Sequence, residues 1–177
     1  MFSPTPYVTF ELRTDVKAEK NRNNISWRLP LNEELFANGQ WRISIDAICI
    51  HVKSVKQREN ETDQIQEKKI RAFKKRSKMF KVFCNVTKSE FHWVSKMRRF
   101  VDTAVYPEWQ PVEYVTFDSI AVNQDAIFIN KDKKLHPVNQ VYDQLTIDLQ
   151  PIFGNYSGYK LNDLNGKASV LLSLYKQ

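Results

Sequence analysis

The residues with the most distinctive chemistry in this sequence of 177 residues are basic. Between His51 and Lys78, ten lysines and arginines accompany four acidic residues, so this segment carries +6 of the net charge of +7. Seven of the ten lie within eleven residues: Lys68, Lys69, Arg71, Lys74, Lys75, Arg76 and Lys78. Such a cluster can neutralise phosphates or bind an acidic protein surface, and its binding weakens as salt rises. A solvated loop without a partner is the alternative interpretation.

A second basic group, which includes Arg98 and Arg99, lies among aromatic and aliphatic residues in the sequence FHWVSKMRRFV. Arginines beside buried aromatic residues are typical of protein interfaces. A core segment with exposed arginines has the same composition, so both interpretations stay open. Three tryptophans are candidate interface anchors if they are exposed in the monomer, namely Trp27, Trp93 and Trp109. We expect Trp41 to be a core residue.

No set of residues predicts an active site. The three histidines, His51, His92 and His136, are scattered, and none has a partner at metal-binding spacing. The chain contains four glycines and has no P-loop, dinucleotide-binding turn or G-x-S-x-G motif. We therefore predict a protein without enzymatic activity, cofactor or metal ion, although residues far apart in sequence can converge in a fold.

The two cysteines, Cys49 and Cys84, each lie within an apolar run, which predicts buried reduced thiols rather than a disulfide or a metal pair. No run of about 18 apolar residues predicts a membrane span. The first ten residues lack the basic and apolar regions of a secretory signal. We expect synthesis in a reducing compartment, the cytoplasm or the nucleus.

The elements that position these residues are predicted to be strands. The clearest is WRISIDAICI, Trp41 to Ile50, whose alternating apolar residues predict one buried face. The residues assigned to that face are Trp41, Ile43, Ile45, Ala47 and Cys49. Ile48 and Ile50 make the far end apolar on both faces, so this end should lie under another layer or at an interface.

Seven further segments bring the total to about eight strands. They are Met79 to Val86, Val141 to Leu149, Ala168 to Tyr175 and, more weakly, Tyr7 to Arg13, Ile25 to Leu29, Val112 to Phe117 and Ala126 to Ile129. Turn dipeptides such as Asn165-Gly166 and four prolines separate them, and this pattern indicates a sandwich or barrel. Glu61 to Lys78 is the best candidate for a helix. We interpret residues 53–78 as a charged insertion in one domain spanning residues 1–177.

Several segments occur in an order found in a known family. They are Asn24 to Pro30, Gly39 to Ile48, Val82 to Val86, Met97 to Val101, His136 to Val138, Leu145 to Leu149 and Val170 to Leu174. Together they resemble the vertex, or penton-like minor capsid, proteins of Polinton/Maverick elements, adintoviruses and related virus-like elements. The sequence departs from that pattern at Arg42 and Asn85, where the family tends to have acidic residues.

This resemblance implies a single jelly roll with two antiparallel sheets of about four strands each. It implies a virion component that assembles as homopentamers at the five-fold vertices of an icosahedral capsid, beside a double-jelly-roll major capsid protein. Packaged DNA is a further partner that the basic segment could contact. Two alternatives stay open: another minor capsid jelly roll, and a nucleic-acid-binding module with a basic loop on a β-scaffold.

Overall fold

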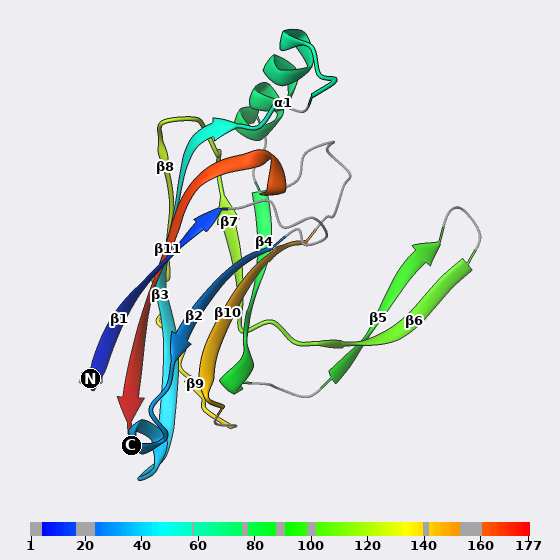
Figure 1. Cartoon of the computed structure of the whole chain (residues 1–177). Helices are drawn as coiled ribbons and strands as arrows, with labels where there is room; N and C mark the ends of the chain where they lie inside the picture. Colours follow the sequence, from blue (N-terminus) through cyan, green and yellow to red (C-terminus); the bar gives the residue numbers. More distant parts are fainter. Residues whose placement is uncertain are drawn as a thin grey trace.

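The computed structural model describes residues 5–16, 24–57, 59–75, 78–87, 91–98, 102–139, 142–152 and 161–177 (Figure 1). Two antiparallel sheets face each other. The first contains β1 (Val8–Val16), β11 (Leu164–Lys176), β3 (Trp41–Val55) and β8 (Asp125–Ile129) in this spatial order, with β9 (His136–Pro137) also paired to β3. The second contains β2 (Ile25–Pro30), β10 (Gln144–Pro151), β4 (Lys78–Cys84) and β7 (Glu113–Phe117).

The path of the chain through these two sheets defines a jelly roll. Among the eight main strands, every connection crosses from one sheet to the other except the one from β4 to β7, which are neighbours in the second sheet. The last strand, β11, lies between β1 and β3, and β10 lies between β2 and β4. This is the arrangement of two Greek keys in a double-sheet jelly roll. The predicted all-β fold is therefore confirmed, and each of the eight predicted segments contains a strand, although β4 ends at Cys84 rather than Val86, β10 begins at Gln144, and Val141 lies outside the described residues.

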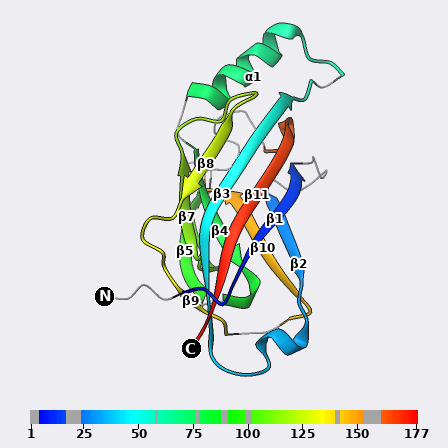
Figure 2. The ribbon, with the colours of Figure 1, turned by 90° about the vertical axis from the view of Figure 1, so that its left-hand side faces the viewer.

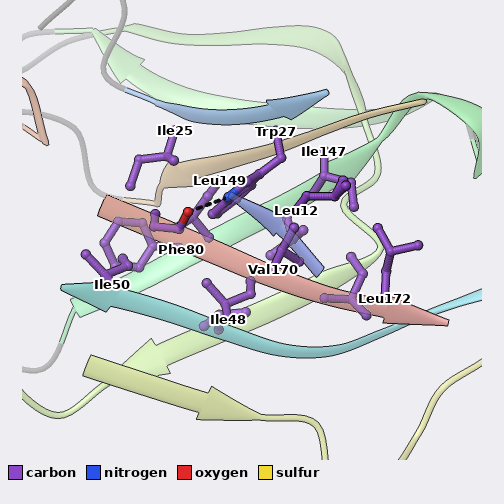
Figure 3. Packing of buried hydrophobic residues seen from close by; sticks show 14 of the residues in the cluster. Leu12, Ile25, Trp27, Ile48, Ile50, Phe80, Ile147, Leu149, Val170 and Leu172 are labelled. Atoms are coloured by element: carbon purple, nitrogen blue, oxygen red, sulfur yellow. Dashed lines mark hydrogen bonds between the residues drawn. The ribbon is translucent and has the colours of Figure 1, made fainter. Parts of the chain in front are cut away.

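The core lies between the two sheets (Figure 3). Strand β10 shows how the sequence forms it, because Leu145, Ile147 and Leu149 are buried and alternate with the half-buried Thr146 and Asp148. Side chains in a strand point alternately to opposite faces, so this period of two places the apolar set in the core. Burial of one such side chain contributes about 1.5–3 kcal/mol.

Strand β3 changes the face that it buries at a β-bulge. Leu172 is paired with Ile45 and Leu171 with Ala47, so Asp46 is an extra residue in the ladder. One additional residue reverses the alternation. Trp41, Ile43 and Ile45 before the bulge, and Ile48 and Ile50 after it, are all buried. Ala47 and Cys49 therefore lie half-buried on the outer face, and their predicted place on the buried face is wrong.

A second irregularity lies farther along β3, where Gly166 of β11 is paired with Val52 and Asn165 with Ser54. The backbones come so close here that a Cβ added to Gly166 would lie 2.0 Å from the carbonyl oxygen of His51. No side chain fits in that space, so this position requires glycine.

Two elements lie outside the sandwich. Helix α1 (Asp63–Lys75) connects β3 to β4 at one end, where a helix was predicted, but β3 reaches Val55 and β4 begins at Lys78. The insertion is thus shorter at both ends than residues 53–78. Between β4 and β7, β5 (Phe91–Arg98) and β6 (Asp102–Trp109) form a separate two-stranded sheet. The remaining elements are the short 3-10 helices η1 (Glu33–Phe36), η2 (Asn85–Thr87) and η3 (Leu161–Asp163).

Candidate interaction surfaces

Helix α1 is attached to the sandwich by its inner side. Lys69 Nζ lies 2.5 and 2.7 Å from the two carboxylate oxygens of Glu61 and 3.8 Å from Asp163. Gln66 Nε2 donates a hydrogen bond to the carbonyl oxygen of Val55 at 3.1 Å. The half-buried Ile70 packs against the core. Lys69 therefore fixes the helix rather than forming part of an exposed basic surface.

The other predicted basic residues lie in different environments. Lys68 and Arg71 are exposed on α1, and Arg71 lies 3.5 Å from Glu67 one turn earlier. Lys78 is only 2 % exposed because it shares the inward face of β4 with Phe80, so its predicted place in an exposed cluster is wrong. Lys74 and Lys75 belong to α1, whose backbone the structure describes at these positions, whereas Arg76 and Arg99 lie outside the described residues.

The candidate aromatic anchors lie in different parts of the fold. Trp27 is 1 % exposed, and its Nε1 donates to the carbonyl oxygen of Ala168 on the facing sheet at 3.0 Å (Figure 3). Its role as a surface anchor is therefore wrong, because its alternation with the outward residues of β2 points it inward. Trp41 is buried as expected. Trp93 and Trp109 belong to the β5–β6 sheet, in which Arg98 is paired with Asp102.

An apolar patch on the outer face of the first sheet was not predicted. Ile127 and Ile129 of β8 are 58 % and 63 % exposed, and Leu171 of β11 is also exposed. The strand register joins them through β3: Leu171, Ala47 and Ile129 form one row, and Ser169, Cys49 and Ile127 form the next. We call these six residues the outer patch. The outer face of this sheet is turned toward the viewer in Figure 2.

Polar groups border the outer patch at both ends. At one end, His51 Nδ1 lies 2.6 Å from Asp125 Oδ1, and Lys167 is the register partner of His51. At the other end, Asp46 accepts hydrogen bonds from the hydroxyls of Ser44 at 2.8 Å and Ser173 at 2.5 Å. An apolar centre with a polar rim is the usual composition of a protein interface. The sequence contained one signal for the outer patch: the far end of the strand Trp41 to Ile50 has apolar residues on both faces.

A pocket of about 490 Å³ lies beside Trp41 near Gln177, at the end of the sandwich away from α1. Its lining includes Phe36, Arg42 and Asn139. Trp41 Nε1 is buried and has no hydrogen-bond partner among the described residues. None of the predicted site residues lines this pocket.

A group of buried polar side chains lies between β3, β7 and β9. Asn130 Nδ2 donates to Ile45 O at 3.0 Å and to Glu113 Oε1 at 3.2 Å, and His136 Nε2 lies 3.6 Å from the same carboxylate oxygen. Within the described ranges, no cluster of histidine, cysteine and acidic side chains could hold a metal ion. The described helices include none long and apolar enough to cross a membrane.

Both cysteines are free thiols. Cys84 is buried as predicted, and burial raises its pKa to about 11. Cys49 is half-buried on the outer patch, where desolvation and the nearby Asp125 raise its pKa as well. Neither thiol therefore has the lowered pKa that is typical of a catalytic cysteine.

Comparison with known proteins gives a limited result. No model of a known protein family matches the chain, and no curated protein matches its sequence. Among solved structures, VP1 of Trichodysplasia spinulosa-associated polyomavirus in complex with 3'-sialyllactose is similar, with a TM-score of 0.37 and 9% identity over 98% of this chain and 97% of VP1. The same VP1 in complex with sialylated precision glycooligomers gives a TM-score of 0.37 and 8% identity over 99% and 96% of the two chains. Similarity at this level carries no argument about function, and the jelly-roll assignment rests on the strand order and register of this chain.

Proposed function

We propose that this protein is a structural capsid subunit of an icosahedral DNA virus or virus-like element, and that it forms the penton at the five-fold vertex. The observation that carries the proposal is the outer patch, an exposed apolar surface spanning three strands of a jelly roll. Contiguous apolar patches on the surface of a soluble protein often mark a site where another molecule binds. A shell subunit needs such contacts with its neighbours.

The fold alone does not decide the function, because jelly rolls also occur in lectin domains and cupins. The vertex position is supported by the in-order resemblance to penton-like proteins of Polinton/Maverick elements and adintoviruses. Most of the segments that carry this resemblance fall on strands of the sandwich, among them β2, β3, β4, β10 and β11. The proposal therefore combines a surface suited to assembly with a sequence pattern along most of the chain.

The proposed subunit is one domain spanning residues 1–177, with the segment between β3 and β4 as an insertion. It acts in the virion without enzymatic activity or cofactor. Its partners are copies of itself, arranged as a pentamer, and a double-jelly-roll major capsid protein. A closed ring of identical subunits requires each copy to present two complementary surfaces.

Light scattering of the purified protein, with and without the major capsid protein of the same virus or element, tests this function. We expect a stable mass of five chains, either alone or on addition of the major capsid protein. A monomer that also fails to associate with the major capsid protein contradicts the proposal.

A nucleic-acid-binding module is the second candidate, and the exposed Lys68 and Arg71 on α1 favour it. This function predicts a mobility shift of duplex or single-stranded DNA that weakens steeply with salt. Lys68→Glu with Arg71→Glu should then abolish the shift, whereas Lys167→Glu, an exposed lysine of β11, should reduce it little. If wild-type protein shifts neither form of DNA at low salt, this candidate is wrong.

A further inference from the structure

Strand β8 is an edge of the first sheet, because it pairs with β3 and no described strand lies beyond it (Figure 2). Asn130 N donates to Asp46 O at 2.8 Å and extends the ladder between β8 and β3 by one residue. Backbone groups of an edge strand point alternately toward and away from the neighbouring strand. The N–H and C=O groups of Ile127 and Ile129 therefore point away from β3, and within the described ranges no other backbone hydrogen bond satisfies them.

The two edges of the first sheet differ in their outward side chains. Natural proteins usually protect an edge strand with charged residues or proline. Strand β1, at the far edge, carries Glu11 and Arg13 on its outer face, and these two side chains bind each other at 3.1 Å. Strand β8 instead presents Ile127 and Ile129, which are 58 % and 63 % exposed. The apolar side of the outer face thus lies directly beside an unprotected edge.

The sequence of this edge is its own antiparallel complement. From Asp125 to Lys131 it reads DAIFINK, with an acidic residue at one end, an apolar centre around Phe128 and a basic residue at the other end. Suppose that a second copy runs antiparallel with Phe128 opposite Phe128. Asp125 then lies opposite Lys131 of the second copy, and Ile127 lies opposite Ile129. Asp125 and Lys131 are both exposed, so both can reach a neighbouring copy.

We infer that β8 pairs with β8 of a second copy of this chain about a two-fold axis at Phe128. In this register the free backbone groups of Ile127 and Ile129 face those of Ile129 and Ile127 in the other copy and form hydrogen-bonded pairs. The first sheet then continues through both copies, and the pair of Asp125 with Lys131 forms on each side of the axis. Parallel pairing in register would place Lys131 beside Lys131, and like charges opposite each other destabilise a sheet.

This pairing goes beyond the proposed function and does not rest on it. A two-fold contact is isologous and does not close a ring of five subunits. The pair is therefore a form of the free subunit, in which Ile127 and Ile129 are covered outside the shell. A strand of five residues gives a contact below the size of a standard interface, so the fraction of paired chains should depend on protein concentration.

Exchange of charges tests the register. Asp125→Lys places a lysine opposite Lys131 of the second copy, and Lys131→Asp places an aspartate opposite Asp125, so each variant alone should dimerise roughly tenfold more weakly. A mixture of the two variants restores both opposite-charge pairs, and its dissociation constant should return to within about twofold of the wild-type value. Sedimentation velocity over a series of concentrations measures each constant. Lys134→Asp, an exposed lysine outside the pair, is the control and should weaken the dimer little.

A disulfide at Phe128 tests the position of the axis. In the inferred register the two residues 128 form a non-hydrogen-bonded pair, whose Cα atoms lie about 4.5 Å apart and within disulfide range. Cys49→Ser removes the half-buried thiol of the outer patch from the background. In that background, Phe128→Cys should give a disulfide-linked dimer under mild oxidation. Thr116→Cys, exposed on the edge strand β7, should not.

The outcomes separate this inference from the proposed function. A wild type that stays monomeric at its highest soluble concentration, or a mixture of the charge variants that dimerises no better than either alone, overturns the pairing. If the wild type forms a mass of five chains and Phe128→Cys gives no more disulfide than Thr116→Cys, the pairing is wrong and the capsid function stands. If the charge variants complement each other but the protein fails to associate with the major capsid protein, the pairing stands and the capsid function is wrong.

Discussion

Trp27 on β2 and Ala168 on β11 join the two sheets through the middle of the core, because the indole Nε1 donates a hydrogen bond to the carbonyl oxygen at 3.0 Å. Both residues are buried. Few polar contacts cross the interior of a sandwich, so this bond fixes how the sheets are positioned against each other. Trp41, a second buried tryptophan, has an Nε1 without a partner among the described residues.

Replacement of these two tryptophans measures the value of that bond. Trp27→Phe removes the donor and leaves a buried carbonyl oxygen with less compensation, which costs about 1–3 kcal/mol in addition to the lost volume. Trp41→Phe loses similar volume without a hydrogen bond. Urea unfolding should therefore show a larger loss of unfolding free energy for Trp27→Phe. Equal losses would mean that the bond contributes nothing.

Gly166→Ala should destabilise the protein by about 3 kcal/mol or more, because its Cβ would overlap the His51 carbonyl and the backbone would have to move. Gly39→Ala is the comparison. Gly39 has φ +100°, and its nearest neighbour is the flexible end of Lys176, so this change should cost about 1–2 kcal/mol from the backbone conformation. Thermal unfolding of both variants gives the order of their stabilities. If Gly166→Ala were more stable than Gly39→Ala, the close approach of Gly166 to the His51 carbonyl would be contradicted.

Lys69→Met should loosen α1 from the sandwich, because two largely buried carboxylates, Glu61 and Asp163, lose a cation. We expect a loss of about 1–3 kcal/mol. Lys68→Met, one residue earlier and exposed, should change stability by less than about 0.5 kcal/mol. Hydrogen exchange of the α1 amides distinguishes the two, and equal protection in both variants would exclude an anchoring role for Lys69.

The two thiols should differ in their reaction with an alkylating reagent. Cys84 is buried with a pKa of about 11, so it should react only after denaturation, whereas the half-buried Cys49 should react in the native protein. One modified thiol per native chain and two per denatured chain are expected. If copies of the chain contact each other through the outer patch, Cys49 should react more slowly in the oligomer than in an Ile127→Lys, Ile129→Lys variant.

Burial of Cys84 also gives a pH dependence of stability. The folded protein holds the proton up to about pH 11, whereas the unfolded thiol loses it near 9.0. The unfolded state therefore binds fewer protons between these values, and stability falls as pH rises through this window. The urea midpoint of Cys84→Ala should fall less than that of the wild type between pH 8 and pH 10.5. The same change of urea midpoint with pH in both proteins would contradict the raised pKa of Cys84.

The sequence predicted the sandwich well because its strands alternate clearly. Trp27 could also have been placed correctly, since it alternates with Ser26 and Arg28 and shares a face with Ile25 and Leu29. The two residues of β9 are too few to produce a period. The sequence pattern did not reveal the bulge at Asp46, because Ala47 and Cys49 are small enough to fit on either face of the strand.

The outer patch and the β5–β6 hairpin were missed for different reasons. Ile127 and Ile129 lie in a strand that is apolar on both faces, a pattern recognised at Ile48 and Ile50 but not here. The β5–β6 residues were interpreted as a core or interface segment, because composition does not reveal that a hairpin stands apart from the sheets. Position relative to the sandwich depends on tertiary structure, which local periodicity does not encode.

The extra residue Asp46 reverses the alternation of inward and outward side chains within β3. On either side of Asp46 the side chains of β3 alternate regularly, but the alternation is shifted by one residue between the two sides. Deletion of Asp46 would make the ladder regular, with Ile45 beside Leu172 and Ala47 beside Leu171 as before, so Ile48 and Ile50 would stay in the core. A regular strand that kept Asp46 would instead turn Ala47 and Cys49 inward and Ile48 and Ile50 outward. One unpaired residue thus decides which side chains of β3 build the interior and which build the outer surface.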